Sequence, residues 1–156
     1  MSDNTPLVSV IMNCYNSDRY LREAIDSVYA QTYLNWEIIF WDNLSDDKSQ
    51  IIANSYDEKL KYFRSDKHTI LGEARHLATK KASGKYLAFL DCDDIWLKDK
   101  LKKQVNLFLS SDQNLGFIYG RSEIISNENN NSHFPKLQDP LHQGKIFKYL
   151  CKGNFI

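Results

Sequence analysis

The chain has 156 residues, of which 42% are hydrophobic and 26% charged, and this composition is typical of a soluble globular protein rather than a disordered one. Lys plus Arg and Asp plus Glu each total 20, so the formal net charge is zero. A neutral chain has no overall attraction to nucleic acid, which argues against nucleic acid as a partner. The length fits one domain spanning residues 1–156.

The cysteines and the start of the chain bear on location. Cys14, Cys92 and Cys151 are far apart and form neither a CxxC pair nor an even set, so we expect a reducing compartment. Residues 1–6 lack the basic and apolar regions of a signal peptide. No apolar run approaches the ~20 residues that cross a bilayer. We therefore expect a cytoplasmic protein without a transmembrane segment in this chain, and peripheral attachment to the inner membrane face stays open.

Short apolar runs alternate with segments of helical periodicity as far as residue ~110. The runs predict strands at residues 7–12, 36–41, 60–64 and 85–90. The segments between and after them predict helices at residues 18–28, 46–52, 70–82 and 97–109. Ser17 or Asp18 could cap the first helix, and Asp46 the second. The alternation predicts an α/β fold, with a mostly parallel, Rossmann-like sheet flanked by helices.

The pattern is less regular after residue 110. Residues 115–119 predict a fifth strand, with residues 122–126 as its hairpin partner. The polar stretch NENNNS at residues 127–132 predicts a loop, and residues 143–152 predict a helix. The last four residues, GNFI, resemble the start of another element. We therefore expect the chain to be truncated inside a larger catalytic domain.

An acidic stretch follows the fourth predicted strand. The sequence FLDCDDIW at residues 89–96 places Asp91, Asp93 and Asp94 directly behind an apolar run. Carboxylates this close repel one another, and each loses hydration beside a buried strand. In open α/β sheets, ligands bind beyond the carboxyl ends of the strands. The polar segments at residues 13–16 and 42–43 follow two other predicted strands, so we expect all three segments to meet at one edge of the sheet.

A divalent cation would explain the acidic stretch. Mg²⁺ and Mn²⁺ suit oxygen ligands, and Mg²⁺ commonly binds one or two carboxylates together with phosphate oxygens. A cation between the carboxylates and a diphosphate would relieve the repulsion and neutralise a departing phosphate. An isolated DxD motif also recurs by chance, and one of its aspartates then more often caps a helix. Asp94 is the candidate for such a cap, since a helix is expected near Trp96.

Two long segments of the chain resemble the amino-terminal half of family-2 glycosyltransferases. They read VSVIMNCYNSDRYLREAIDSVYAQTYLNWEIIFWDN and GEARHLATKKASGKYLAFLDCDDIWLKDKL. The likeness covers residues ~7–105 in order and register. It implies an inverting glycosyltransferase with the A-type nucleotide-sugar-binding fold, of which this chain would be the donor-binding part.

The resemblance implies roles for residues on the donor side. Asn13, Tyr15 and Asn16 match the segment that lies against the nucleoside, although many members have Pro at the position of Asn13. Asp42 matches an aspartate that commonly hydrogen-bonds the base, often uracil. Arg75 matches a basic residue in a G-x-x-x-A-R-N stretch, here GEARH, and is poised between contact with an anion and a surface ion pair.

The resemblance also implies a metal site. Asp91 and Asp93 match the DxD motif of the family, in which the first aspartate usually lies near the ribose and the second ligates the metal. Asp93 is therefore the best single candidate ligand and Asp91 the second, with Mn²⁺ or Mg²⁺ as the cofactor. Cys92 lies between them and is expected to contact the donor.

Several aromatic side chains have more than one interpretation. Tyr20, Tyr29 and Tyr33 are expected to pack around the first helix rather than to form a sugar platform. Trp96 could either cover the edge of the core or line the donor pocket. These two interpretations of Trp96 stay open.

The implied reaction moves a sugar from a nucleotide-diphosphate donor, expected to be a UDP-sugar, to an acceptor hydroxyl with inversion at the anomeric carbon. The metal acts as a Lewis acid on the leaving diphosphate. Acceptors in the family include saccharides, lipid-linked sugars and proteins, and cell-surface polysaccharide biosynthesis is the expected setting. In the family the general base lies well after the DxD motif, beyond the part seen here, so no catalytic residue is assigned.

Other functions remain as alternatives. The same fold could serve as a catalytically incomplete nucleotide-sugar-binding module. A phosphoacceptor receiver-like domain also places acidic residues at strand ends, but it needs a Lys after the fifth strand, where this chain has Tyr119 and Gly120. A dinucleotide-dependent oxidoreductase is excluded because no GxGxxG turn follows the first strand.

Overall fold

A computed structural model describes residues 5–111, 115–125, 132–133 and 144. The chain divides into two compact units, Met1–Ser111 and Asp112–Ile156, and each is described by itself. The assignment of residues 1–156 to a single domain stays a prediction.

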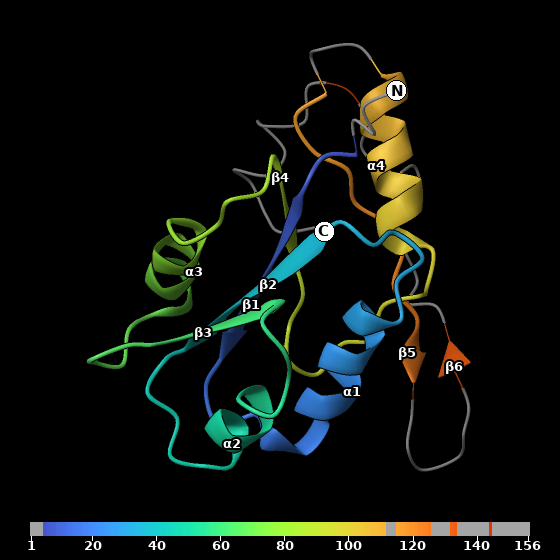
Figure 1. Ribbon diagram of the computed structural model, residues 1–156. Coiled ribbons are helices and arrows are strands. Elements are labelled where there is room, and N and C mark those ends of the chain that lie inside the picture. The colour runs from blue at the N-terminus through green and yellow to red at the C-terminus, as the bar shows by residue number, and fades with distance from the viewer. Residues whose placement is uncertain (1–4, 112–114, 126–131, 134–143, 145–156) are drawn as a thin grey trace. The chain divides into compact units, whose positions relative to one another are not determined.

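The first unit is built on a four-stranded parallel sheet. Its strands are β1 (Val8–Cys14), β2 (Trp36–Asp42), β3 (Leu60–Arg64) and β4 (Tyr86–Phe89). They lie in the order β3-β2-β1-β4, with β1 and β2 in the centre (Figure 1). All four strands lie within two residues of the ranges expected from the apolar runs. The predicted parallel α/β fold is confirmed.

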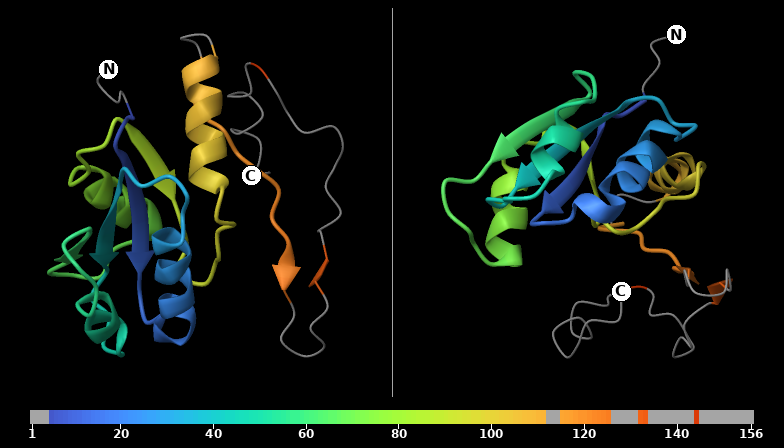
Figure 2. Two further views of the ribbon diagram at one scale, coloured as in Figure 1. Left: turned by 45° about the vertical axis from the view of Figure 1, so that its right-hand side comes forward. Right: turned by 90° about the horizontal axis from the view of Figure 1, so that it is seen from below.

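Four helices cover the two faces of this sheet. They are α1 (Asp18–Tyr29), α2 (Ser49–Ala53), α3 (Leu71–Thr79) and α4 (Lys100–Ser110). α3 lies on one face, and α1, α2 and α4 lie toward the other, as the views of Figures 1 and 2 show. Each helix follows a strand in the chain, which is the arrangement that parallel pairing requires.

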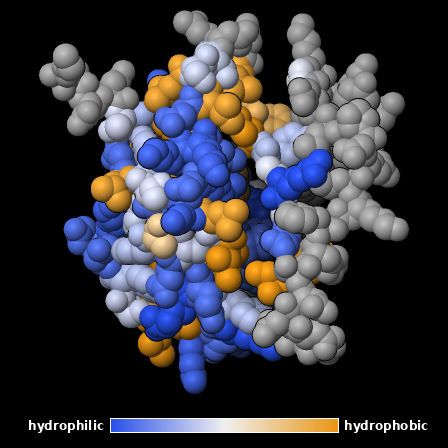
Figure 3. Space-filling model, turned by 90° about the vertical axis from the view of Figure 1, so that its right-hand side faces the viewer, coloured by the Kyte–Doolittle hydropathy of each residue, from blue (hydrophilic) through white to orange (hydrophobic). Residues whose placement is uncertain are grey.

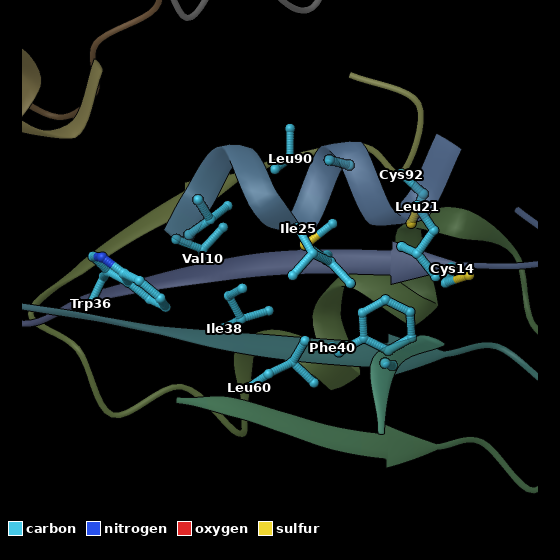
Figure 4. Packing of buried hydrophobic residues seen from close by; sticks show 14 of the residues in the cluster. Val10, Cys14, Leu21, Ile25, Trp36, Ile38, Phe40, Leu60, Leu90 and Cys92 are labelled. Carbon is cyan, nitrogen blue, oxygen red and sulfur yellow. The ribbon is translucent and has the colours of Figure 1, made fainter. Parts of the chain in front are cut away.

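The core has a large part and a small part. The large part joins alternate residues of β1 and β2 to the apolar sides of α1 and α4. It includes Val10, Ile25 and Phe40, which Figure 4 labels, and Leu101 of α4. The small part lies under α3 and includes its Ala74 and Ala78. Strand residues of opposite parity therefore reach opposite layers. Each fully buried aliphatic side chain contributes ~1.5–3 kcal/mol, so the central strands account for much of the stability.

The helix starts differ from the sequence expectation. The Ser17 hydroxyl donates to the Tyr15 carbonyl and does not cap α1, and Asp46 does not cap α2. The carboxylate of Asp47 instead accepts the backbone N–H groups of Asp18 and Ser49, each at 2.9 Å. One side chain thus satisfies a donor at the start of both helices, which the sequence around either helix alone does not reveal.

α4 starts later than expected. Residues 91–99 contain no helix, with turns at residues 92–93 and 98–99, and α4 begins at Lys100, so Asp94 does not cap it. The predicted apolar side of this helix included Leu97 and Leu109, but these side chains are exposed, whereas Leu101 and Val105 are buried. Exposed apolar side chains also lie in patches among polar ones on the face shown in Figure 3.

The second unit has little regular structure among its described residues. A two-residue strand β5 (Ile124–Ile125) pairs antiparallel with β6 (Ser132–His133). The predicted strand at residues 115–119 is wrong, because these residues form no ladder and Phe117 is 43% exposed, so the segment lacks the buried face that its apolar pattern suggested. The predicted loop before Ser132 and the predicted helix at residues 143–152 lie outside the described residues, except for Ser132 and Gly144.

A cluster of polar side chains stabilises the amino-terminal edge of the sheet. Glu37 on β2 is 5% exposed, and its carboxylate accepts hydrogen bonds from Ser9 and Lys61, both at 2.6 Å, and from the Ser83 N–H at 2.9 Å. Burial raises the pKa of Glu37, but the hydrogen bonds from these groups outweigh it and hold the pKa at about 2. The cluster joins β1, β2, β3 and the turn before β4.

This cluster predicts an acid-sensitive contribution to stability. The pKa of Glu37 lies below its ordinary value of 4.5, so its stabilising effect is present above pH 4.5 and is lost as the pH falls toward about 2. Lys61 is half exposed, and screening should reduce the loss to about 2 kcal/mol. Urea unfolding at pH 6 and pH 2.5 should show a smaller fall in unfolding free energy for Glu37→Gln than for the wild type. An equal fall in unfolding free energy for Glu37→Gln and the wild type would contradict the stabilising role of this cluster.

Gly84, in the turn before β4, predicts a second effect on stability. A Cβ at this position would lie 2.6 Å from the Ser9 backbone nitrogen and 2.8 Å from the Leu7 carbonyl oxygen. We expect Gly84→Ala to lower the unfolding free energy by about 1–3 kcal/mol. Gly72→Ala is the matched control, since no atom lies within 4 Å of its Cβ and Ala favours the α3 helix. If denaturant unfolding gave the same unfolding free energy for Gly84→Ala and Gly72→Ala, the close approach of the backbone at Gly84 to β1 would be contradicted.

Candidate functional site

Three polar segments meet at the carboxyl-terminal edge of the sheet. Cys14 at the end of β1 pairs with Asp42 at the end of β2. On the other side of β1, the Leu90 N–H donates to the Ile11 carbonyl at 3.1 Å, which extends the β1–β4 pairing to the residue before Asp91. The strand directions therefore bring residues 13–16, 42–43 and 91–94 to one edge, as the sequence led us to expect.

A pocket of about 370 Å³ opens at this edge. It is lined by Asn13, Asn16, Ser17, Arg19, Tyr20, Leu71, Asp91, Cys92 and Asp93. Of the residues that sequence reasoning selected, Asn13, Asn16, Asp91, Cys92 and Asp93 line it. The other three, Tyr15, Asp42 and Arg75, lie outside its lining.

Sequence reasoning missed the wall that the first turn of α1 contributes. Arg19 places its guanidinium 4.8 Å from the ring centre of Tyr20, and both line the pocket. Tyr29 and Tyr33 pack against the core as expected, but Tyr20 also faces the pocket. Their position in the sequence was the available signal: Arg19 and Tyr20 come three and four residues after Asn16, and a helix that starts there must begin beside the ligand edge.

The acidic loop, residues 91–95, has one buried residue between exposed carboxylates. Cys92 is 5% exposed, and its thiol donates to the Asn13 carbonyl at 3.3 Å. Asp91 and Asp93 are exposed, and Asp91 accepts a hydrogen bond from Arg75 at 2.7 Å. Burial and the charges of Asp93 and Asp91 raise the pKa of Asp94. The Arg75 contact therefore balances one charge of the loop, and the remaining carboxylates repel one another.

Asn13 adds an unpaired polar group beside the loop. Its side-chain Oδ1 and Nδ2 atoms are both buried, and neither has a hydrogen-bond partner among the residues that the structure describes. An unpaired buried amide costs about 1–3 kcal/mol. Since Asn13 lines the pocket, a polar ligand there could supply the missing partners.

Asp42 is placed differently from the other candidates. It has no exposed surface, and its carboxylate accepts hydrogen bonds from Tyr62 at 2.5 Å, Arg64 at 2.6 Å and the Ser45 N–H at 2.7 Å. Burial and the hydrogen bond to Asp42 raise the pKa of Tyr62 to about 12. In this arrangement Asp42 ties the ends of β2 and β3 together, and its contact with a base stays a prediction.

Tyr15 forms an aromatic surface next to the same edge. It is 49% exposed, and its ring centre lies 4.1 Å from that of His68. The His68 Nδ1 atom lies 3.1 Å from the Asn43 carbonyl, and the Asn43 side chain donates to the Thr69 carbonyl at 2.7 Å. His68 was not selected from the sequence, because nothing in the loop after β3 shows that it folds back onto Tyr15.

The acidic loop could bind a divalent cation only if a bound ligand supplies further oxygen atoms to the ion. Among the described residues, no group of three or more His, Cys, Asp or Glu side chains could hold a metal ion by itself. Mg²⁺ needs only one or two carboxylates when phosphate oxygens complete its coordination, and Mn²⁺ favours the same oxygen ligands. Asp93 and the second oxygen of Asp91 could meet that requirement, so the donor set fits such an ion. Trp96 packs against the large core rather than lining the pocket.

None of the helices within the described ranges has the length and hydrophobicity of a membrane span.

The contrast between Asp42 and Asp93 predicts opposite effects on stability. Asp42→Asn removes the charge that accepts bonds from Tyr62 and Arg64, and we expect a loss of about 2–3 kcal/mol of unfolding free energy. Asp93→Asn removes a charge that repels Asp94, and the unfolding free energy should stay equal or rise. Guanidinium unfolding at pH 7 measures both. A destabilised Asp93→Asn would show that Asp93 is part of the framework.

Comparisons with known proteins agree with this geometry. The family model described as Glycosyl transferase family 2 matches residues 9–154. A UDP-Glc:alpha-D-GlcNAc-diphosphoundecaprenol beta-1,3-glucosyltransferase of Escherichia coli is 39% identical over 135 residues, which is 86% of this chain and 51% of that protein. The chain spans about half the length, or less, of the curated relatives that it matches.

Two solved structures share the fold. TarS residues 1–349 of S. aureus in complex with UDP-GlcNAc has a TM-score of 0.62 and 30% identity, over 65% of this chain and 30% of that one. A mannosyltransferase of Pyrobaculum calidifontis in complex with GDP-Man and Mn²⁺ has a TM-score of 0.63 and 24% identity, over 70% of this chain and 34% of that one. The expected A-type glycosyltransferase fold is therefore confirmed. The chain belongs to glycosyltransferase family 2.

Proposed function

We propose that the protein transfers a sugar from a nucleotide-diphosphate donor, a UDP-sugar, to an acceptor hydroxyl with inversion, and that residues 5–111 form the donor side of its site. The observation that carries this proposal is the pocket in which the acidic loop and the unpaired amide of Asn13 lie together. The E. coli relative is named as a UDP-glucose-dependent enzyme, and the S. aureus neighbour is solved with UDP-GlcNAc, which supports the choice of uridine.

The nucleoside would lie along the segment after β1. Asn13 and Asn16 line the pocket, and Tyr15 offers an exposed ring against which a base could stack. Asn16 has a φ of 49°, a left-handed conformation that Asn tolerates, and its side chain accepts the Asp46 N–H at 2.9 Å. This segment is thus held in place before a ligand arrives.

The diphosphate would lie over the acidic loop. Asp93, with Asp91 as a second ligand, would hold Mn²⁺ or Mg²⁺, and Arg75 would keep Asp91 oriented. When bound, the cation supplies Lewis-acid assistance to the departing diphosphate. Cys92 keeps the loop against Asn13, so Asp91 and Asp93 both face outward on either side of a buried residue.

The name of one relative supports a proposal for the acceptor class and the location. The E. coli enzyme is named for an acceptor sugar on a diphosphoundecaprenol carrier, and we propose a lipid-linked saccharide as the acceptor here. Such an acceptor implies a cytoplasmic protein that works peripherally at the inner membrane face, in the assembly of a cell-surface polysaccharide. No catalytic base is assigned to the described residues.

The donor site can be tested by calorimetry and thermal shift. We expect UDP and UDP-sugars to bind and to raise the melting temperature in the presence of Mn²⁺, because a ligand that binds only the folded state stabilises it. Asp93→Asn should weaken the Mn²⁺-dependent part of UDP affinity by about 10-fold or more. Glu58 has an exposed carboxylate two residues before β3, so Glu58→Gln is the control and should bind UDP as the wild type does.

The outcomes separate the competing functions. If the affinity for UDP changed neither when Mn²⁺ is removed nor in Asp93→Asn, the proposal of a metal-assisted donor site would be overturned. Tight donor binding without sugar transfer by a full-length enzyme would identify a nucleotide-sugar-binding module instead. Phosphorylation of an aspartate by acetyl phosphate would point to a receiver-like domain.

A further inference from the structure

The segment that follows the acidic loop is held by Ser27 in the last turn of α1 and by Gln31, two residues after that helix ends. Residues 96–101 run from Trp96 to the first turn of α4, and their backbone bonds to side chains that lie about 70 positions earlier in the chain. The residues that make these contacts do not line the pocket. Neither Ser27 nor Gln31 was selected from the sequence.

Ser27 makes the first contact. Its hydroxyl accepts the Trp96 N–H at 3.1 Å and donates to the Ala24 carbonyl at 2.7 Å. Ser27 is buried, and its hydroxyl oxygen is the acceptor for the Trp96 N–H. The bond fixes the backbone three residues after Asp93.

Gln31 makes the second contact with both ends of its amide. Its Nε2 atom donates to the Leu97 carbonyl at 2.9 Å and to the Ser27 carbonyl at 3.0 Å, and its Oε1 atom accepts the Leu101 N–H at 3.0 Å. The Gln31 side chain is 2% exposed, and its amide makes all three of these hydrogen bonds. Thr32, the next residue, also donates its N–H to the Lys98 carbonyl at 2.9 Å.

The first half of the acidic loop is held at Asp91 by Arg75 and at Cys92 by Asn13, and its second half reaches its next attachment at Trp96. On its amino-terminal side, Leu90 bonds to β1, and Cys92 bonds to Asn13. On its carboxyl-terminal side it reaches Ser27 and Gln31. The bond from the Asp94 N–H to the Asp91 carbonyl, at 3.2 Å, is a turn within the loop itself. The position of the Asp93 carboxylate therefore depends on where these two attachments hold the backbone.

We propose that Ser27 and Gln31 are positioning residues for the cation and diphosphate site, and we call the pair the Ser27–Gln31 anchor. The inference rests on the proposed donor site. Without the anchor the loop would spend only part of its time in the geometry that binds the ion, and apparent affinity falls in proportion to that fraction. The anchor touches neither the ion nor the donor, and it acts through the backbone of residues 96–101.

A matched pair of serines tests the anchor. Ser9 and Ser27 are both buried, and each hydroxyl accepts one backbone N–H from a segment next to β4 and donates one hydrogen bond. Ser9 accepts from Gly84 before the strand, and Ser27 accepts from Trp96 after it. Ser9 donates to the Glu37 carboxylate and Ser27 to a neutral carbonyl, so Ser9→Ala should destabilise the fold at least as much as Ser27→Ala, while only Ser27→Ala disturbs the acidic loop.

Calorimetry of UDP binding at several Mn²⁺ concentrations gives the first readout. We expect Ser27→Ala, and likewise Gln31→Met, to weaken the Mn²⁺-dependent affinity by about 10-fold, with Ser9→Ala within about twofold of the wild type. Equal affinities for Ser9→Ala and Ser27→Ala would overturn the inference. The inference would also be overturned if Ser27→Ala weakened UDP binding by the same factor when no Mn²⁺ is present, because the anchor acts through the cation site.

Hydrogen exchange of residues 91–98 gives a second readout that needs no ligand. The exchange should be faster in Ser27→Ala than in Ser9→Ala, at a temperature where both proteins are folded. If the wild type binds no nucleotide with Mn²⁺, the proposed function fails, and the exchange rates still decide whether the anchor holds the loop. Equal exchange in the two variants would show that it does not.

Discussion

Parallel pairing of β1 with β2 on one side and β4 on the other is the constraint on which the rest of the structure depends. Because the three strands run in the same direction, their carboxyl ends lie at one edge, and backbone hydrogen bonds fix which residues are neighbours there. Cys14 is placed beside Asp42, and the acidic loop starts on the far side of β1. The pocket therefore forms where it does because of the strand direction. The strand pairing also fixes where the backbone places the side chains that line it.

The two ends of the sheet treat polar groups in opposite ways. At the amino-terminal end, Glu37 receives hydrogen bonds from three different segments and has a depressed pKa, so its charge is fully compensated. At the carboxyl-terminal end, the Asn13 amide is buried without partners, and the pKa of Asp94 is raised by its neighbours. The first arrangement stabilises the fold, and the second leaves polar groups that a ligand can satisfy.

The sequence was informative where one physical rule dominates. Buried strands need apolar runs and the family resemblance spans the acidic loop, so the sheet, its helices and the position of Asp91 and Asp93 could be predicted. The cap of α1 could not, since Asp47 reaches it from 29 positions away. The start of α4 was misplaced because the pattern through Leu97 is apolar, although that side chain is 84% exposed.

The candidate site shows the same limit. Asp42 carries the expected residue type at the expected strand end, but its burial depends on Tyr62 and Arg64 of β3, which no local pattern connects to it. The contributions of Arg19 and Tyr20 depend on the direction in which α1 leaves β1, and those of Ser27 and Gln31 on contacts across about 70 positions. Long-range contacts of this kind are visible only once the backbone is placed.

The bridging carboxylate of Asp47 has a consequence for how this region can vary. The connection from β1 to α1 and the connection from β2 to α2 are joined by Asp47, by the Asn16 N–H bond to Ser45 and by the Asn43 N–H bond to Cys14. An insertion in either connection would break bonds made by both. The lengths of the two connections are therefore tied to each other, and homologous chains should shorten or extend them together or not at all.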